Sequence, residues 1–178
     1  MSAHDPRPRG WDLAVLGDPL AYTLSPLLYA VGHRLLGASG SADALRTPTA
    51  ALAARLSELR DRGYRGANIT HPLKQAALGW VDRASERARR SRSVNTVGFE
   101  ADHTWGDTTD GAGFLDWLVA LGRVVARERV VVLGAGGAAR SVALALAEAQ
   151  VGGLQIAARR PDELVAEWSD IPSARLVK

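Results

Sequence analysis

The sequence contains no cysteine. This absence excludes a disulfide framework, a thiolate nucleophile and a cysteine-ligated metal. Long hydrophobic runs are also missing. The longest stretch without a charged or strongly polar residue covers residues 130–139, whereas a membrane-spanning helix needs about 20 residues. The first ten residues, MSAHDPRPRG, show no apolar stretch after their charges, so no signal peptide is predicted. We therefore expect a cytoplasmic protein with no membrane partner.

Aromatic residues are scarce, at 6% of the chain, and do not alternate with basic residues. The net charge of +3 comes from 22 basic and 19 acidic residues, and the pI is about 9.8. The basic residues are spread along the chain, and the nearest approach to a cluster is Arg83, Arg87, Arg89, Arg90 and Arg92. This pattern favours a solvated helix face over a polyanion-binding surface. No nucleic-acid partner is expected.

Lysine and asparagine are almost absent. Lysines occur only at positions 74 and 178, so 20 of the 22 basic residues are arginine, and the only asparagines are Asn68 and Asn95. A lysine can lose its proton when its surroundings shift its pKa, whereas arginine stays protonated. The single internal lysine, Lys74, is therefore conspicuous. Composition alone still favours an ordinary surface lysine.

The pattern along the chain alternates strands with helices. Strands are predicted at residues 13–17, 42–46, 66–70, 93–99, 103–107, 130–133, 154–158 and 175–177, and helices at 25–36, 49–62, 73–81, 85–91, 110–121, 141–149 and 161–168. Ser25 and Asp110 stand at the expected N-caps of their helices. The alternation indicates an α/β protein with largely parallel sheets. The pattern of residues along the chain changes near Arg127, which indicates a second domain.

A glycine-rich loop follows the strand at 130–133. Gly134, Gly136 and Ala139 fit the pattern G-x-G-x-x-G/A between a strand and a helix. In that pattern the first glycine makes the turn, and the second lets the backbone approach a pyrophosphate. The third small residue lets helix and strand pack closely. The alternative is a glycine-rich turn without a ligand.

The end of the next strand bears on the type of dinucleotide. An NAD site usually places an acidic residue there, but this strand runs into Arg159 and Arg160. Arginine suits a 2′-phosphate by its charge and its bidentate geometry. The sequence therefore favours NADP, with two merely solvated arginines as the alternative.

Four polar segments precede the glycine loop. They are GDPLAYTLSP at 17–26, GANITHPLK at 66–74, SVNTV at 93–97 and GDTTDG at 106–111. Together with GAGGAAR and AARR, in this order from about residue 12 to 160, the sequence resembles shikimate dehydrogenase. The resemblance implies an NADP-dependent oxidoreductase that reduces 3-dehydroshikimate to shikimate in aromatic amino-acid (chorismate) biosynthesis. It also implies a monomer or homodimer with a small-molecule substrate.

The resemblance implies a fold and two domains. Residues 1–112 are expected to form a three-layer α/β substrate-binding and catalytic domain. Residues 113–178 are expected to form part of a doubly wound, Rossmann-type NADP-binding domain.

The resemblance also assigns roles residue by residue. Thr23 and Ser25 match hydroxyls that hold the substrate carboxylate, and Thr70 and Asn95 match substrate-binding residues. Lys74 matches the catalytic lysine and Asp110 its carboxylate partner, so the two are expected within hydrogen-bonding or ion-pair distance. The cofactor-binding residues are expected to be Gly134, Gly136, Gly137, Ala138, Arg159 and Arg160. The histidines show no metal-ligand spacing, and no metal is expected.

Several features depart from the family pattern. Thr23 stands in place of a serine, Thr108 in place of an asparagine, and Ala158–Arg160 in place of Asn-Arg-Thr. Residues 130–178 are too few for a six-stranded doubly wound sheet. Two or three parallel strands and one glycine-loop helix are expected there, as in the N-terminal part of a truncated enzyme. Such a chain would leave a sheet edge and apolar surface exposed.

Three alternative functions remain open. The first is a truncated, inactive protein that binds ligand without turnover. The second is a quinate/shikimate dehydrogenase. The third is an enzyme similar to methylenetetrahydrofolate dehydrogenase, against which the TLSP and GDTTDG segments argue.

Overall fold

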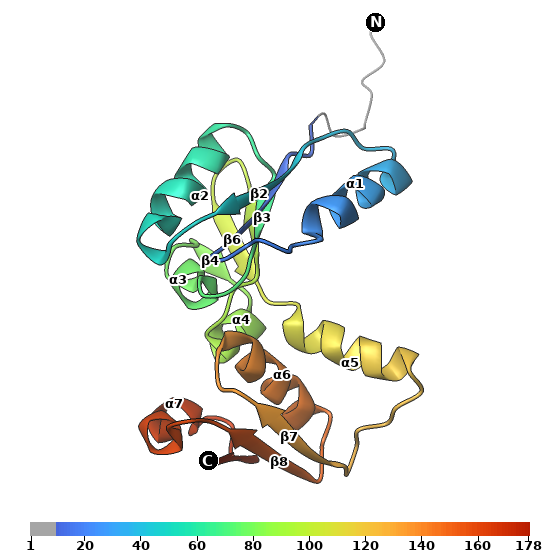
Figure 1. Ribbon diagram of the computed structural model, residues 1–178, viewed down its shortest axis with the longest axis vertical. Coiled ribbons are helices and arrows are strands. Elements are labelled where there is room, and N and C mark those ends of the chain that lie inside the picture. Colours follow the sequence, from blue (N-terminus) through green and yellow to red (C-terminus); the bar gives the residue numbers. More distant parts are fainter. Residues whose placement is uncertain (1–9) are drawn as a thin grey trace, which may run out of the picture. The chain divides into compact units, whose positions relative to one another are not determined.

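The computed structural model describes residues 10–178 (Figure 1). The segment on which the signal-peptide prediction rests lies almost wholly outside these residues. The chain forms two compact units. Within the described residues, the first unit runs to Ala84 and includes Val94–Gly106, and the second comprises Ser85–Ser93 and Asp107–Lys178. The domain boundary expected between residues 112 and 113 stays a prediction.

The first unit is built around a six-stranded sheet of order β2-β1-β3-β5-β6-β4. Its strands are β1 (Leu13–Gly17), β2 (Ala42–Arg46), β3 (Gly66–Ile69), β4 (Arg83–Ala84), β5 (Thr96–Phe99) and β6 (Thr104–Asp107). β1 pairs in parallel with β2 and β3, and β5 runs antiparallel to β3. Strand β4 was not predicted. It pairs in parallel with β6, and hydrogen bonds between Asp82 and Thr104 fasten its start.

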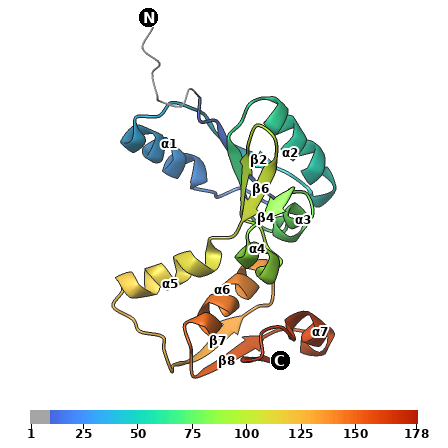
Figure 2. The same ribbon diagram turned by 180° about the vertical axis from the view of Figure 1, so that it is seen from behind.

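Helices cover both faces of this sheet. Helix α1 (Ser25–Leu36) lies on one face, and the short 3-10 turn η1 (Thr49–Ala51), α2 (Leu52–Asp61) and α3 (Lys74–Leu78) lie on the other (Figures 1 and 2). Strand β1 buries its last four residues, and α2 buries apolar residues that recur at helical spacing. The buried residues of this core include Leu16, Leu56, Leu59, Ile69 and Val97. The predicted three-layer α/β arrangement is confirmed.

The second unit contains a three-stranded parallel sheet. Its strands β7 (Arg129–Leu133), β8 (Gly153–Ala157) and β9 (Ala174–Val177) lie in chain order, with α6 (Gly137–Glu148) as the crossover between β7 and β8. Its other elements are α4 (Glu86–Ser91), α5 (Asp110–Ala120), η2 (Pro161–Leu164) and α7 (Val165–Trp168). The expected sheet of two or three parallel strands with a glycine-loop helix is confirmed, in a Rossmann-like segment.

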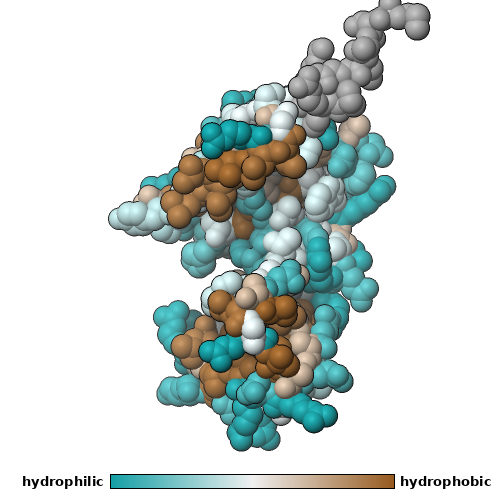
Figure 3. Space-filling view, turned by 90° about the vertical axis from the view of Figure 1, so that its right-hand side faces the viewer, coloured by the Kyte–Doolittle hydropathy of each residue, from teal (hydrophilic) through white to brown (hydrophobic). Residues whose placement is uncertain are grey.

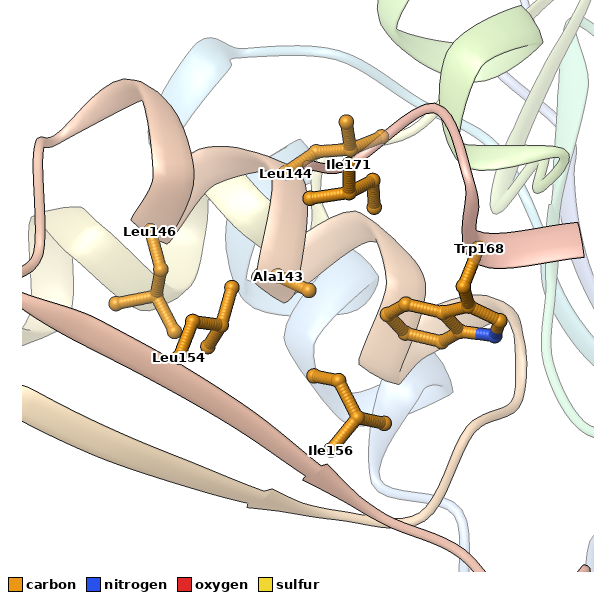
Figure 4. Close-up of a cluster of buried hydrophobic side chains, with 7 residues drawn as sticks. All are labelled: Ala143, Leu144, Leu146, Leu154, Ile156, Trp168 and Ile171. Atoms are coloured by element: carbon orange, nitrogen blue, oxygen red, sulfur yellow. The ribbon is translucent and has the colours of Figure 1, made fainter. Parts of the chain in front are cut away.

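The core of the second unit lies between α6 and the sheet (Figure 4). It comprises Ala143, Leu144, Leu146, Leu154, Ile156, Trp168 and Ile171. Val130 and Val132 of β7 pack against this core, whereas Val131 and Leu133, which alternate with them, are exposed. One face of β7 is thus buried and the other faces solvent.

Two helix starts differ from the predictions. Leu24 is the N-cap of α1, and Ser25 is its first helical residue. The Ser25 N–H donates to the hydroxyl of Thr23 at 3.3 Å, so one N–H group that the start of the helix leaves without an intrahelical acceptor has a partner. Thr109 is the N-cap of α5 and makes no side-chain cap bond. Asp110 therefore lies in the first turn of the helix, where the positive end of the helix dipole stabilises its carboxylate.

Candidate functional site

Polar residues of the first unit gather at one end of its sheet. Gly17 and Thr70 lie at the carboxyl ends of the parallel strands β1 and β3, and Asn95 precedes the antiparallel strand β5. The Ile69 N–H donates to the Asn95 carbonyl at 2.8 Å, and the Thr70 N–H donates to the Leu16 carbonyl at 2.8 Å. These bonds fix the backbone of Thr70 and Asn95 on adjacent strands.

The close approach of Gly17 to Thr70 explains the glycine. A Cβ atom built at Gly17 would lie 2.4 Å from Cγ2 of Thr70 and 3.1 Å from the His71 carbonyl oxygen. A side chain there would displace the turn that carries Thr70. The segment at 17–26 therefore supports the segment at 66–74 through packing as well as through hydrogen bonds.

Thr23 and Ser25 lie where the loop after β1 leads into α1. Their hydroxyl oxygens are 3.2 Å apart, and both residues are partly buried. Two hydroxyls at the start of a helix can donate to a carboxylate, and the helix N-terminus favours that negative charge. The extra methyl of Thr23 does not prevent this pairing.

Asn68 was not assigned a role from the sequence, although it is one of only two asparagines. On β3, its Nδ2 donates to the Asn95 carbonyl at 3.1 Å and to the Thr96 hydroxyl at 3.3 Å, and its Oδ1 accepts from the Tyr29 hydroxyl of α1. Burial raises the pKa of Tyr29 to about 12, so this phenol remains a donor at neutral pH. Asn68 thus ties α1, β3 and β5 together beside Asn95. The scarcity of asparagine is the sequence signal by which Asn68 could have been identified.

Lys74 is the first residue of α3 and is half-buried. Its carbonyl accepts the Val94 N–H at 3.0 Å, next to Asn95. Leu73, the preceding residue, is fully buried and donates its N–H to the Thr70 carbonyl. Backbone bonds therefore hold the start of α3 beside Thr70 and Asn95, so the structure brings these three predicted residues to one end of the first unit.

Asp110 belongs to the second unit, in the half-buried first turn of α5. The turn before it is held by Asp107, whose Oδ1 accepts from the Ser85 hydroxyl at 2.5 Å, Arg87 Nε at 2.7 Å and the Thr108 N–H at 2.8 Å. Burial would raise the pKa of Asp107, but the Arg87, Ser85 and Thr108 hydrogen bonds outweigh it and lower the pKa. Asp107 is therefore a charged anchor. The expected approach of Lys74 and Asp110 stays a prediction.

The glycine loop connects β7 to α6. Gly134 has a φ of +104°, which favours glycine, and a Cβ atom at Gly136 would meet no protein atom within 4 Å. Packing therefore does not demand glycine at 136, but the approach of a ligand would. Gly136 is the N-cap of α6 without a side-chain cap bond. The first N–H groups of this helix are thus suited to a phosphate.

A cavity of about 390 Å³ lies beside this loop at the carboxyl ends of β7 and β8. Gly134, Ala157, Arg159, Arg160 and Glu163 are among its lining residues. Arg160 pairs with Glu163 at 3.1 Å, whereas Arg159 is exposed and has no hydrogen bond or ion pair with any residue from 10 to 178. The glycine loop and Arg159 therefore line one cavity, in which the guanidinium of Arg159 is available to a phosphate. Gly137 begins α6 at the same loop, followed by Ala138. These residues fit a dinucleotide.

Among residues 10–178, the structure shows neither a metal-ion cluster nor a membrane-spanning helix. No group of three or more histidine, aspartate and glutamate side chains gathers in this range in a way that could hold a metal ion. No helix in this part of the chain is long and apolar enough to span a membrane.

The fold and these residues define an α/β protein with a polar cluster on one unit and a dinucleotide-type glycine loop on the other. Residues 15–97 match the family model of the shikimate dehydrogenase substrate binding domain. The resemblance of the N-terminal part of the chain to shikimate dehydrogenases is thereby confirmed.

Named relatives extend the similarity beyond that domain. The shikimate dehydrogenase (NADP(+)) of Thermus thermophilus is 48% identical over 136 residues, which are 76% of this chain and 51% of the relative. That of Aromatoleum aromaticum is 40% identical over 151 residues, which are 84% of this chain and 54% of the relative. This chain therefore spans about half the length of the curated relatives it matches.

A solved structure shows the same fold. The crystal structure of shikimate 5-dehydrogenase from Thermus thermophilus, in complex with NADP(H) and shikimate, has 42% sequence identity and a TM-score of 0.85. The match covers 94% of this chain and 62% of that structure. It includes both units of this chain.

Proposed function

We propose that this chain carries the N-terminal part of an NADP-dependent oxidoreductase that reduces 3-dehydroshikimate to shikimate. The observation that carries the proposal is the match over 94% of the chain to a shikimate dehydrogenase described with NADP(H) and shikimate. The polar cluster of the first unit and the glycine-loop cavity of the second support it. Both contain the residue types that this reaction needs.

On the substrate side, the residues suit a polyhydroxylated carboxylic acid. The paired hydroxyls of Thr23 and Ser25 would hold the carboxylate, and Thr70 and Asn95 would bind ring hydroxyls. Such bonds hold the ketone in a fixed pose, which contributes the proximity term of catalysis. Asn68 would act with Asn95, because its amide donates to the Asn95 carbonyl.

The ketone oxygen needs a proton during reduction. When bound, NADPH supplies the hydride to the carbonyl carbon. We propose that the ammonium of Lys74 stabilises the charge that develops on the oxygen and donates a proton to it. Asp110 is the proposed carboxylate partner of that lysine. The proton leaves Lys74 and is restored from solvent, so the reaction consumes one proton for each ketone reduced.

On the cofactor side, the glycine loop and the N-terminus of α6 would hold the pyrophosphate. Residues Gly134, Gly136, Gly137 and Ala138 supply the backbone for it. The guanidinium of Arg159 would bind the 2′-phosphate, with Arg160 beside it. A cytoplasmic location and a monomer or homodimer are part of the same proposal.

The deciding experiment is the shikimate-dependent reduction of NADP⁺, followed by the absorbance of the NADPH formed, with the 178-residue chain. Turnover with shikimate that exceeds turnover with quinate supports the proposal. A chain that binds shikimate and NADPH in equilibrium titrations without turnover would instead support the ligand-binding alternative. Failure to bind either ligand would contradict both.

A further inference from the structure

Helix α5 begins in unusually close contact with α6. A Cβ atom at Gly111 would lie 2.4 Å from the Ser141 carbonyl oxygen and 3.0 Å from the Cβ atom of Ala145. Glycine at 111 therefore lets the first turn of α5 lie against the backbone of α6. Asp110, immediately before it, is carried by this contact.

A buried hydroxyl pair completes the contact. The Gly111 N–H donates to the Ser141 hydroxyl at 3.1 Å, and the Thr108 hydroxyl lies 3.2 Å from that same oxygen. Thr108 and Ser141 are 2% and 5% exposed. Thr109 supplies no side-chain cap to α5, so the Ser141 hydroxyl satisfies an N–H group that the helix leaves unpaired.

Helix α6 is itself firmly held and begins at the glycine loop. Arg140, next to Ser141, donates to the Arg90 carbonyl at 3.1 Å, the Glu167 carbonyl at 2.8 Å and both Asp170 oxygens at 2.6 Å. Its side chain is 1% exposed. Because α6 starts at the glycine loop, a residue that is bonded to α6 is also held in place relative to that loop.

We propose that Ser141 is a positioning residue, whose hydroxyl fixes the first turn of α5, and with it Asp110, on the helix that begins at the glycine loop. The Thr108 hydroxyl, which lies 3.2 Å from that of Ser141, contributes to the same anchoring. The inference rests on the proposed function in giving Asp110 a catalytic role. Its structural content, the anchoring of Gly111 by Ser141, is independent of that role.

The first experiment measures amide hydrogen exchange by NMR in the full 178-residue chain. Ser141→Ala removes the acceptor of the Gly111 N–H, so this amide should exchange about fivefold to tenfold faster. The amides of Leu154 and Ile156 in β8 should be unchanged. Thr108→Val, which keeps the shape and removes the hydroxyl, should act in the same direction, and Thr108→Ser should resemble the parent. The Thr108 pair serves as the test if Ser141→Ala does not fold.

The second experiment measures kcat and KM with shikimate and NADP⁺. Ser141→Ala should lower kcat about tenfold or more, since small displacements of a catalytic group are costly, and should change KM by less than about twofold. In an Asp110→Asn background the same substitution should cause no further loss, because Ser141 acts through Asp110. Thr108→Ser should restore the kcat that Thr108→Val loses.

Two results would overturn the inference. One is unchanged Gly111 exchange in Ser141→Ala. The other is an equal loss of kcat in the parent and in the Asp110→Asn background. A parent chain without turnover would contradict the proposed function instead, and the exchange comparison would then decide the inference by itself.

Discussion

At the scale of single residues, the position of Lys74 is set by the backbone around it. It is the first residue of α3, and hydrogen bonds from Leu73 to Thr70 and from Val94 to Lys74 fix the backbone around it. The adjacent Leu73 is buried, which holds the helix start in place. These backbone contacts therefore set where the lysine side chain leaves the fold, beside Thr70 and Asn95.

Replacing Lys74 with alanine should lower kcat by about 10²- to 10⁴-fold, because proton donation acts in the transition state. The KM for shikimate should change much less. Steady-state kinetics of Lys74→Ala measure both values. Lys178→Ala is the matched control, since it removes the only other lysine and should leave kcat unchanged. Equal kcat in Lys74→Ala and the parent would contradict the role.

Arg159 should determine the preference for NADPH. Charge-assisted hydrogen bonds contribute about 1.5–3 kcal/mol, so Arg159→Ala should weaken NADPH binding by about tenfold to 100-fold and leave NADH binding unchanged. Fluorescence titration with both cofactors provides the measurement. Arg160→Ala is the comparison variant, because Arg160 is already paired with Glu163, and it should weaken NADPH binding less. Equal NADPH and NADH affinities in the parent would contradict the prediction.

At the scale of elements, α6 organises the second unit. Its apolar face supplies Ala143, Leu144 and Leu146 to the core, and its Arg140 reaches α4 and the segment after α7. The guanidinium of Arg140 also lies over the Trp168 ring, 5.5 Å from the centroid. The helix that begins at the glycine loop therefore serves as the structural centre of its unit.

Arg140→Met should destabilise the chain by about 2–4 kcal/mol, since it leaves two carbonyls and the Asp170 carboxylate without their donor. Urea unfolding followed by circular dichroism measures the change. Arg90→Ala, which removes the exposed pair with Glu148, is the control and should cost at most about 1 kcal/mol. Similar losses in the two variants would show that Arg140 is not a buried anchor.

Lowering the pH should reduce the stability that Asp107 gives to the turn before α5. Burial would raise the pKa of Asp107, but its hydrogen bonds with Arg87 and Ser85 lower it. An unfolded aspartate titrates near pH 3.9, so this stabilisation is fully present above about pH 4 and is lost as the pH falls through the lower folded pKa. Thermal unfolding between neutral and strongly acidic pH should show a steeper acid loss in the parent than in Asp107→Asn. Identical slopes would rule out this contribution.

At the scale of the whole molecule, the chain exposes much apolar surface. Leu24, Leu27, Leu28, Val31 and Leu35 recur at helical spacing along α1 and its N-cap, and each is between 40% and 81% exposed. Hydrophobic side chains gather over this helix in Figure 3. Contiguous exposed apolar patches of this kind promote association.

We expect the 178-residue chain to bind 8-anilinonaphthalene-1-sulfonate and to self-associate with increasing concentration. Leu28→Gln with Leu35→Gln should reduce both effects, because each Å² of apolar surface withdrawn from water contributes about 25 cal/mol to association. Dye fluorescence and sedimentation velocity measure them. Ala30→Gln, at an exposed position of the same helix, is the control. A monomeric parent without dye binding would contradict the expectation.

Local patterns in the sequence were sufficient to predict most elements. Apolar runs located β1, β7 and β8 to within a residue, and Gly37 ends α1 as expected, with a φ of +63°. Predictions that depended on the first helical turn were less accurate. The predicted helix at 49–62 begins with a 3-10 turn, and that at 141–149 begins at Gly137. The two-residue strand β4 has no signal of its own, because pairing with β6 creates it.

The sequence by itself determined the order of the motifs, the α/β class and the residue types of the candidate site, because spacing and composition are local properties of a chain. Only the tertiary structure placed Thr70, Lys74 and Asn95 at one end of the first unit, and Asn68 beside Asn95. It alone showed that Ser141 and Thr108 hold Gly111. These relations depend on hydrogen bonds and close packing between segments that lie far apart in the chain, and no local pattern encodes which distant partner a buried hydroxyl or amide will meet.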